Sequence, residues 1–370
     1  MARAKNEKKI LYVASSFAHI QRFHLDCIAA LRSDGYTVEI MAKGTNADYD
    51  ISFEKRLFSF KNALLVPKIK GIIRRGCYGA IILNTSLASF YTRVACPRRK
   101  RPRIVNIVHG YLFSEGDRSL RGALLLLAER ILRKKTDVII TMNREDTKLA
   151  EKFRLTRGMI LKIPGMGVKL REQITSPEAV RSEFFRKDAF VMVFVGELSK
   201  RKNQKLLIEA LKIIKKDIPT AQLCLVGDGA LREELQLLAD ELGLSDGVVF
   251  AGERPDACDF IRASDVYVSA STSEGLPFNI VEALGAGKTV IASRVKGHTD
   301  IIEDGTDGIL YEKGNAADLA DRVIKIYRRG TPLSAESIRN KYLMYENNTV
   351  FPKMFSTLKT ALKADFNHHL

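Results

Sequence analysis

Two glutamates, Glu274 and Glu282, flank a predicted helix start in the second half of the chain. Pro277 suits the first turn of a helix, and Gly275 lets the backbone approach a ligand closely just before it. The free N–H groups and the dipole of such a helix favour anionic or hydroxyl-rich ligands. Carboxylate pairs also accept hydrogen bonds from sugar hydroxyls. Taken alone, the same spacing fits a capping acid followed by a solvated acid.

A basic loop is predicted at the end of another strand. Gly196 permits a turn directly after the apolar run 190–195. Lys200, Arg201 and Lys202 follow, just before a predicted helix. Three cations at this place could neutralise a diphosphate, and a diphosphate leaving group needs such neutralisation. The alternative interpretation is a solvated basic loop.

The elements that must position these residues are short apolar runs that alternate with segments of helical period, a pattern typical of parallel βα units. The predicted strands are 10–14, 38–41, 80–83, 104–108 and 138–141, followed by 190–195, 222–226, 248–251, 266–269, 290–292 and 308–310. The segment 164–168 and the polar stretch up to Pro177 have the composition of a linker. We therefore predict an α/β protein of two doubly wound, Rossmann-like domains that face each other across a cleft.

Four segments, in this order and spacing, resemble a known family. They are Gly-Glu-Leu at 196–198 with Lys-Asn at 202–203, Val-Gly-Asp-Gly at 226–229, Phe-Ala-Gly at 250–252, and Glu-Gly-Leu-Pro at 274–277 with Glu-Ala at 282–283. The chain resembles the family 4 retaining glycosyltransferases of GT-B fold, especially the bacterial capsular and exopolysaccharide branch, over essentially its whole length. The resemblance implies an acceptor-binding domain at 1–168, a nucleotide-sugar-binding domain at 169–345, and a C-terminal helix at 346–370 that packs toward the N-terminal domain.

The same resemblance implies roles in the reaction. Glu274 would hold the donor sugar, beside the backbone of Gly275 and Leu276. Lys202 would meet the diphosphate, and Glu282 would accept the ribose hydroxyls. The remaining donor-binding residues would be Gly196, Lys200, Arg201, Arg254 and Pro255, of which the last two match the loop beside the nucleobase. The family usually has arginine where this chain has Glu197, so Lys200 or Arg201 is expected to substitute for it.

The first half of the chain carries a histidine at a strand end. His109 follows the strand 104–108 and, by the resemblance, would contact the transferred sugar as a third catalytic residue. The alternative is a histidine that serves as a hydrogen-bonding scaffold. The first βα loop lacks the paired glycines of many relatives, and its Ser16 and His19 are open to an acceptor-side role or to packing.

Positive charge is concentrated in the first half. Residues 1–183 carry 35 Lys and Arg against 17 Asp and Glu, whereas residues 184–370 carry 25 against 26. This asymmetry favours a surface that meets phosphates, of nucleic acid or of anionic lipid, with a merely soluble basic domain as the alternative. Cations gather at 68–75, on an expected exposed turn at 98–103, and on a Leu-rich helix at 120–135 that suits interfacial binding unless it belongs to the core.

The sequence also excludes several classes. Apolar stretches such as 123–128 and 189–195 are far shorter than the roughly 20 residues of a membrane span. The charged N-terminus has no signal core, so we predict a cytoplasmic protein that associates peripherally with the inner face of the cell membrane. The five cysteines include no C-x-x-C pair, and neither disulfides nor a metal site is expected.

We predict a metal-independent glycosyltransferase that moves a hexose or N-acetylhexosamine from a nucleoside diphosphate sugar, expected to be UDP-linked, to a lipid-linked saccharide of a bacterial surface polysaccharide. No cofactor besides this donor is expected. A divalent metal ion is not expected either, because no D-x-D pair follows a strand at the proposed site. The alternatives are a non-catalytic nucleotide-sugar-binding protein and a nucleic-acid-binding protein. The neutral second half and the absence of tryptophan argue against nucleic acid. No G-x-G-x-x-G follows the first strand, which argues against a dinucleotide-dependent oxidoreductase.

Overall fold

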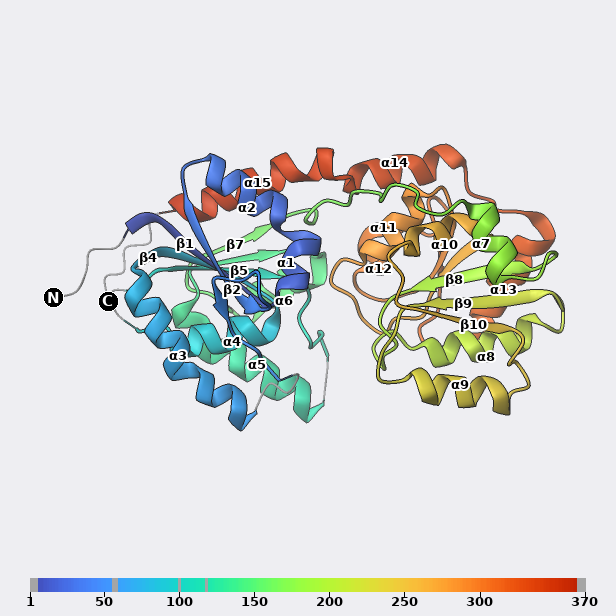
Figure 1. Cartoon of the computed structure of the whole chain (residues 1–370), viewed down its shortest axis with the longest axis horizontal. Coiled ribbons are helices and arrows are strands. Elements are labelled where there is room, and N and C mark those ends of the chain that lie inside the picture. The colour runs from blue at the N-terminus through green and yellow to red at the C-terminus, as the bar shows by residue number, and fades with distance from the viewer. Residues whose placement is uncertain (1–5, 55–58, 99–100, 117–118, 365–370) are drawn as a thin grey trace. The chain divides into compact units, whose positions relative to one another are not determined.

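The computed structural model describes residues 6–54, 59–98, 101–116 and 119–364, and it contains two compact units (Figure 1). The first comprises Met1–Gly167 and Val350–Leu370, and the second comprises Val168–Thr349. Each unit is built on a parallel sheet with helices on both faces. The predicted α/β class with two Rossmann-like domains is therefore confirmed.

The sheet of the first unit has the order β3-β2-β1-β4-β5-β6-β7. Its strands are parallel and their central residues are buried, as expected for apolar runs covered by helices on both faces. The chain moves from β1 to one side and returns to β4 on the other, so the strand order reverses between them. The bounds are β1 Asn6–Ser16, β2 Thr37–Lys43, β3 Tyr49–Asp50, β4 Tyr78–Asn84, β5 Arg103–Val108, β6 Val138–Thr141 and β7 Met159–Lys162.

Helices α2 and α15 cover one face of this sheet, and α3, α4 and α5 cover the other (Figure 1). The guanidinium of Arg103 donates to the carbonyl of Leu362 on α15, and Lys359 lies 3.1 Å from Asp34. The C-terminal helix thus packs on the N-terminal domain, as predicted. The helices are α1 Phe17–Phe23, α2 Leu25–Ser33, α3 Phe60–Gly76, α4 Ser86–Ala95, α5 Leu120–Leu132, α6 Arg144–Lys152 and α15 Asn347–Lys363.

The sheet of the second unit has the order β10-β9-β8-β11-β12-β13. Its strands are β8 Phe190–Val195, β9 Ala221–Val226, β10 Val248–Gly252, β11 Val266–Ser269, β12 Thr289–Ser293 and β13 Ile309–Tyr311. Helices α8 and α9 lie on one face, and α10 and α11 on the other (Figure 1). The helices are α7 Pro177–Phe184, α8 Gln204–Ile214, α9 Arg232–Glu241, α10 Ala257–Ala263, α11 Phe278–Gly285, α12 His298–Ile301, α13 Ala316–Arg329 and α14 Ala335–Tyr345.

The glycines of the Val-Gly-Asp-Gly segment allow the ends of β8 and β9 to touch. A Cβ at Gly227 would lie 2.2 Å from the carbonyl oxygen of Gly196, and one at Gly229 would lie 2.3 Å from that of Leu198. Such distances are too short for any side chain, so only glycine fits at these positions. The segment therefore holds the loop after β8 in place.

The basic turn 98–103 differs from its prediction. Arg98 is exposed, but Arg101 is buried and makes a two-pronged ion pair with Asp137, in which Nη2 and Oδ1 are 2.7 Å apart. Arg103 is half-buried, and the other two cations, Arg99 and Lys100, lie outside the described residues. The expectation of a fully exposed basic turn was wrong for Arg101 and Arg103, because a distant carboxylate and a helix end supply partners that the local sequence does not show.

The Leu-rich helix lies at the surface of the first unit and is not part of its core. On α5, Leu120 is 77% exposed, Leu124 42%, Leu127 53% and Ile131 67%. Within the described ranges, no helix is both long enough and apolar enough to span a membrane.

Candidate active site

The predicted donor residues lie at the point where the strand order of the second sheet reverses. The chain runs from β8 to β9 and β10 on one side, and then returns to β11 on the other side of β8. The loops that follow β8 and β11 therefore leave the sheet next to each other. Open α/β sheets bind ligands at this kind of switch point. The basic loop at 196–203 and the Glu-Gly-Leu-Pro segment at 274–277 are both found here.

Three predicted residues meet at this point. The ammonium group of Lys202 donates to Oε1 of Glu274 over 2.6 Å, and the guanidinium of Arg201 donates to Oε2. Arg201 also donates to the carbonyl of Ser273 over 3.2 Å, while its own carbonyl accepts from the backbone N–H of Thr272 at 2.8 Å. These bonds join the two loops into one cluster of two cations and one carboxylate.

The charge state of Glu274 follows from this cluster. Burial alone would raise the pKa of its carboxyl, but the positive charges of Lys202 and Arg201 outweigh burial and lower the pKa to about 2. Glu274 is thus a carboxylate at any physiological pH. It can only accept hydrogen bonds, and it is too weak a base to remove a proton from an alcohol at neutral pH.

Side chains within the loops hold the cluster in place. Gln204 donates to the carbonyl of Glu197 over 2.8 Å and accepts from the N–H of Ser199 at 3.2 Å, which closes the basic loop. Asn279, at the start of α11, donates to the carbonyl of Val195 at the end of β8 over 2.8 Å. The start of α11 is thereby fixed beside the basic loop.

Sequence reasoning missed a third loop, which follows β12. The backbone N–H of Glu274 donates to the carbonyl of Lys296 at 3.2 Å, and a Cβ on Gly297 would lie 2.7 Å from the Cβ of Glu274. Gly297 has φ +82°. His298 follows, fully buried, and burial lowers its pKa to about 4, so that it is neutral. The sequence signal that could have revealed this loop was a glycine and a histidine shortly after a predicted strand.

Glu282 is buried on α11. Burial raises the pKa of the Tyr267 phenol on β11, and the negative charges of Glu282 and Glu274 raise it further. Leu276 is buried, Gly275 is half-buried, and Lys200 and Glu197 are exposed. The charges of both carboxylates therefore act on one buried phenol.

Arg254 and Pro255 follow β10 and have other partners. The guanidinium of Arg254 pairs with both oxygens of Asp256 at 2.8 Å and lies 5.3 Å from the ring centroids of Phe184 and Phe260. The carbonyl of Pro255 accepts from Arg171 at 3.3 Å. These partners lie outside the cluster at Glu274, and a place for these two residues beside a nucleobase stays a prediction.

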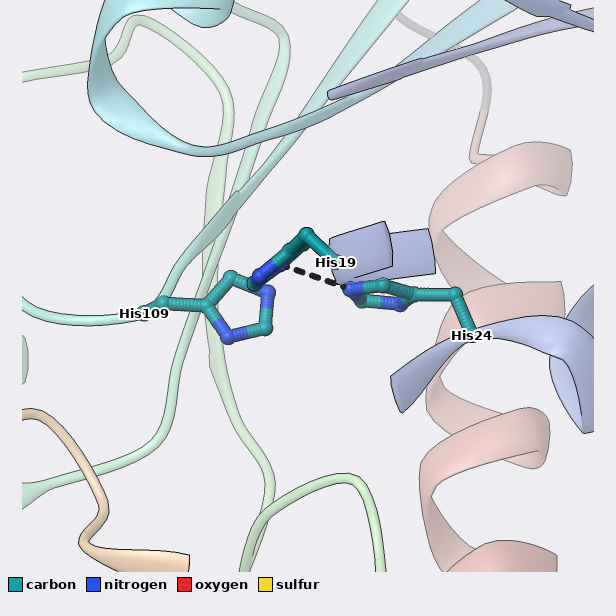
Figure 2. Close-up of side chains that lie close together, drawn as sticks. All are labelled: His19, His24 and His109. Carbon is teal, nitrogen blue, oxygen red and sulfur yellow. Dashed lines mark hydrogen bonds between the residues drawn. The ribbon is translucent and has the colours of Figure 1, made fainter. Parts of the chain in front are cut away.

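In the first unit, His109 follows β5 and meets two further histidines (Figure 2). His19 and His24 come from the segment after β1, and the ring centroids of His109 lie 4.9 and 5.1 Å from theirs. The sequence analysis had named His109 and His19, but His24 was missed because it resembles an ordinary residue of an amphipathic helix. The predicted sugar contact of His109 is not tested by this geometry.

Comparison with known proteins supports the assignment of the fold and identifies the family. Residues 176–344 match the family model described as "Glycosyl transferases group 1", a range that includes the cluster at Glu274. The chain is 32% identical over 335 residues to the putative glycosyltransferase EpsD of Bacillus subtilis, which covers 87% of this chain and 88% of that protein. It is 24% identical over 327 residues to the UDP-Gal:alpha-D-GlcNAc-diphosphoundecaprenol alpha-1,3-galactosyltransferase of Escherichia coli, covering 83% and 84%.

Among solved structures, Anabaena Alr3699/HepE in complex with UDP-glucose aligns with a TM-score of 0.74 and 20% identity, over 95% of this chain and 99% of that one. The sucrose-phosphate synthase of Thermosynechococcus elongatus aligns with a TM-score of 0.79 and 18% identity, over 97% and 100%. The chain belongs to the group 1 glycosyltransferases, the retaining family 4 of GT-B fold. The predicted family and enzyme class are confirmed.

Proposed function

We propose that this glycosyltransferase moves a hexose or N-acetylhexosamine from a UDP-linked donor to a lipid-linked saccharide during synthesis of a bacterial surface polysaccharide. The observation that carries the proposal is the cluster of Arg201, Lys202 and Glu274 at the switch point of the second sheet. Two similar proteins support the choice of substrates: the Escherichia coli enzyme acts with UDP-galactose on a diphosphoundecaprenol-linked sugar, and the Anabaena protein binds UDP-glucose.

The cluster supplies what cleavage of a sugar–diphosphate bond requires. As the bond from the anomeric carbon to the diphosphate oxygen breaks, negative charge grows on the leaving group. Lys202 and Arg201 carry two positive charges against one on Glu274, so the cluster keeps a net positive charge for the diphosphate. Fixed charges of this kind need little reorganisation during the reaction, which is the main source of electrostatic catalysis.

Glu274 and Glu282 are proposed to position the donor. The carboxylate of Glu274, which cannot act as a base at neutral pH, would accept hydrogen bonds from the sugar hydroxyls beside the backbone of Gly275 and Leu276. Glu282 would accept from the ribose hydroxyls. In this proposal Gly196 and Lys200 complete the phosphate side, Arg254 and Pro255 lie toward the base, and His109 contacts the transferred sugar.

Metal independence is part of the proposal. The cations of the cluster take the place that a divalent ion occupies in other transferases. The D-x-D triplet of this chain is Asp48-Tyr49-Asp50, and its carboxylates accept from the backbone N–H groups of Ile40 at 2.7 Å and Gly44 at 3.1 Å. Transfer should therefore persist in EDTA, and an activity that EDTA abolishes and manganese restores would contradict this part.

A panel of nucleotide sugars tests the donor assignment. A ligand that binds only the folded protein at a hundredfold excess over its Kd adds about 2.7 kcal/mol to the free energy of unfolding. UDP-sugars should raise the melting temperature more than GDP- or ADP-sugars, and incubation with a polyprenyl-diphosphate saccharide should give a product of retained anomeric configuration. Stabilisation without any transfer would instead support a non-catalytic nucleotide-sugar-binding protein.

The acceptor side is proposed to lie in the first unit, at an anionic membrane surface. The exposed apolar residues of α5 are accompanied by the exposed cations Arg121, Arg130 and Lys134. A helix with an apolar stripe between cations binds at the interface of anionic lipid without spanning the bilayer. Such binding would bring the first unit to a lipid-linked acceptor.

A further inference from the structure

Three imidazoles from two segments of the first unit converge (Figure 2). His19 lies on α1, His24 lies between α1 and α2, and His109 follows β5. The Nε2 atoms of His19 and His24 are 3.2 Å apart, and one nitrogen of each ring lies within 4.8 Å of the others. Figure 2 shows the ring of His109 pointing toward the other two. Three potential nitrogen ligands therefore share one small volume.

This spacing is close to that of ligands on one metal ion. Two nitrogens bound tetrahedrally to Zn²⁺ at about 2.0–2.1 Å lie roughly 3.3 Å from each other. His19 and His24 already have this separation. Rotation of the imidazole rings about their side-chain bonds would shorten the longer distances.

The surroundings of two rings match those of metal ligands. Nδ1 of His24 lies 2.9 Å from the hydroxyl of the buried Tyr12, so it can donate its proton there. The lone pair of Nε2, which accepts a hydrogen bond from Nε2 of His19 in that tautomer, is then the one that a metal ion would take. Histidine ligands usually have such a partner at the second nitrogen, which fixes the tautomer and the ring orientation. Nε2 of His109 is buried, and no hydrogen-bond partner for it exists among the described residues. A bound metal ion would supply one.

The three rings are neutral, which leaves their nitrogen lone pairs available. Burial lowers the pKa of His19 to about 4 and that of His109 to about 3, and it also lowers the pKa of His24. The charge of Arg22 adds to the effect on His19, and the neighbouring histidines add to it on the other two. The three nitrogens within 4.8 Å of one another, together with the buried Nε2 of His109 that has no partner among the described residues, favour a metal ion.

We propose that His19, His24 and His109 form a binding site for one divalent transition-metal ion, of which Zn²⁺ is the representative. Imidazole suits Zn²⁺, Cu²⁺ and Ni²⁺, whereas Mg²⁺ and Ca²⁺ prefer oxygen ligands. Three protein ligands leave a position open for water or a substrate oxygen. The site lies within the first unit and does not depend on the cluster at Glu274, although it shares His109 with the proposed contacts to the transferred sugar.

Metal titration of the full chain tests the proposal. His368 and His369, adjacent at the C-terminus, are replaced by asparagine in every protein because neighbouring histidines also bind metals. Calorimetry with Zn²⁺ should give one equivalent, Co²⁺ should produce the visible absorption of a four- or five-coordinate ion, and Zn²⁺ should raise the melting temperature. Mg²⁺ should do none of these.

Variants of the ligands provide the controls. His19→Asn, His24→Asn and His109→Asn should each weaken Zn²⁺ binding at least tenfold, and Tyr12→Phe should weaken it about tenfold through the orientation of His24. His19 is only half-buried, so His19→Asn keeps the test valid if His24→Asn fails to fold. His298→Asn removes a buried histidine of the second unit and should leave Zn²⁺ affinity unchanged.

Three results would overturn the site. The first is that Zn²⁺ does not bind at micromolar concentration, and the second is that it binds equally well to a protein that lacks all three histidines. The third is that inorganic pyrophosphate, and not Zn²⁺, stabilises the wild type and loses that effect in His19→Asn, which would identify an anion site. Circular dichroism of each variant confirms that a lost signal comes from the site and not from unfolding.

Discussion

Lys202 Nζ and Glu274 Oε1 lie 2.6 Å apart, although the two residues follow different strands and are separated by 72 positions in the chain. Both side chains are almost entirely buried. A buried ion pair gains little net stability, because desolvation of the two charges offsets most of their attraction. Its presence at a strand-order reversal is therefore better explained by ligand binding than by folding.

The first prediction concerns turnover. Lys202→Met keeps most of the side-chain volume but removes the charge, and Glu274→Gln keeps the shape but removes the carboxylate. Each should lower kcat by about 10² or more, since a single preorganised transition-state contact contributes that much. Lys205→Met is the matched control, because Lys205 lies three residues further on with 60% of its side chain exposed and should be silent. Wild-type turnover in Lys202→Met would refute the phosphate assignment.

The second prediction concerns pH. The folded-state pKa of Glu274 is about 2, below its ordinary value of 4.5, so the carboxylate stabilises the fold above about pH 4.5 and loses that contribution as the pH falls toward 2. The difference in unfolding free energy between the wild type and Glu274→Gln should shrink by about 3 kcal/mol over this window. Urea unfolding at a series of pH values measures it. A difference that stays constant from pH 6 to pH 2 would show that the pair does not lower the pKa.

The third prediction separates backbone strain from contact at the site. Gly297 and Gly314 have nearly the same φ, +82° and +78°, but a Cβ at Gly297 would clash with Glu274 whereas one at Gly314 would meet nothing within 4 Å. Gly314→Ala should lower the free energy of unfolding by only about 1 kcal/mol, the backbone strain of alanine at a positive φ. Gly297→Ala should be clearly less stable and should also weaken binding of the nucleotide sugar. Equal effects of the two substitutions on donor affinity would exclude a role for the loop after β12.

The fourth prediction follows from the corrected basic turn. Arg101→Ala leaves Asp137 buried without its partner, and breaking a buried pair in this way typically costs 3 to 5 kcal/mol. Arg98→Ala, on the same turn but exposed, should change the free energy of unfolding by no more than about 0.5 kcal/mol. Chemical denaturation of both variants decides the point, and similar stabilities would mean that Arg101 is not held by Asp137 in solution.

Local patterns predicted most of the fold and several residues of the candidate site. Apolar runs predicted the central strands, and β6, β8 and β11 have the predicted bounds. The strands β3 and β7 were missed because they are short and lie at the edges of the first sheet, where fewer residues need to be buried. Edge strands carry a weaker apolar signal than central ones.

Within the site, contiguous motifs were visible and contacts between distant segments were not. Lys202 and Glu274 were each found because glycine turns and strand ends surround them in the sequence. The contact of Gly297 with Glu274 and the position of His24 beside His109 depend on which strands are neighbours in the sheet. Periodicity cannot show that, since it reports the face of an element and not its partner.

The last prediction concerns the membrane surface on α5. Leu120, Leu124, Leu127 and Ile131 recur at intervals of four, three and four, which places them on one face of the helix, and all four are exposed. Beside them, Arg130 and Lys134 are exposed, and each cation near an anionic surface contributes about 1 kcal/mol, screened by salt. The chain should therefore sediment with anionic liposomes and only weakly with neutral ones.

Two pairs of variants separate the apolar and the charged contributions. Leu127→Ser combined with Ile131→Ser should weaken binding at every salt concentration, whereas Leu237→Ser, at a 62% exposed leucine of α9, should not. Arg130→Glu combined with Lys134→Glu should weaken binding mainly at low salt, and Arg329→Glu, at an exposed position of the second unit, should have little effect. Affinity for the nucleotide sugar should stay the same in all of them, because α5 belongs to the first unit. Equal binding to neutral vesicles, or no loss of liposome binding in either pair of α5 variants, would show that these residues form an ordinary solvated helix face.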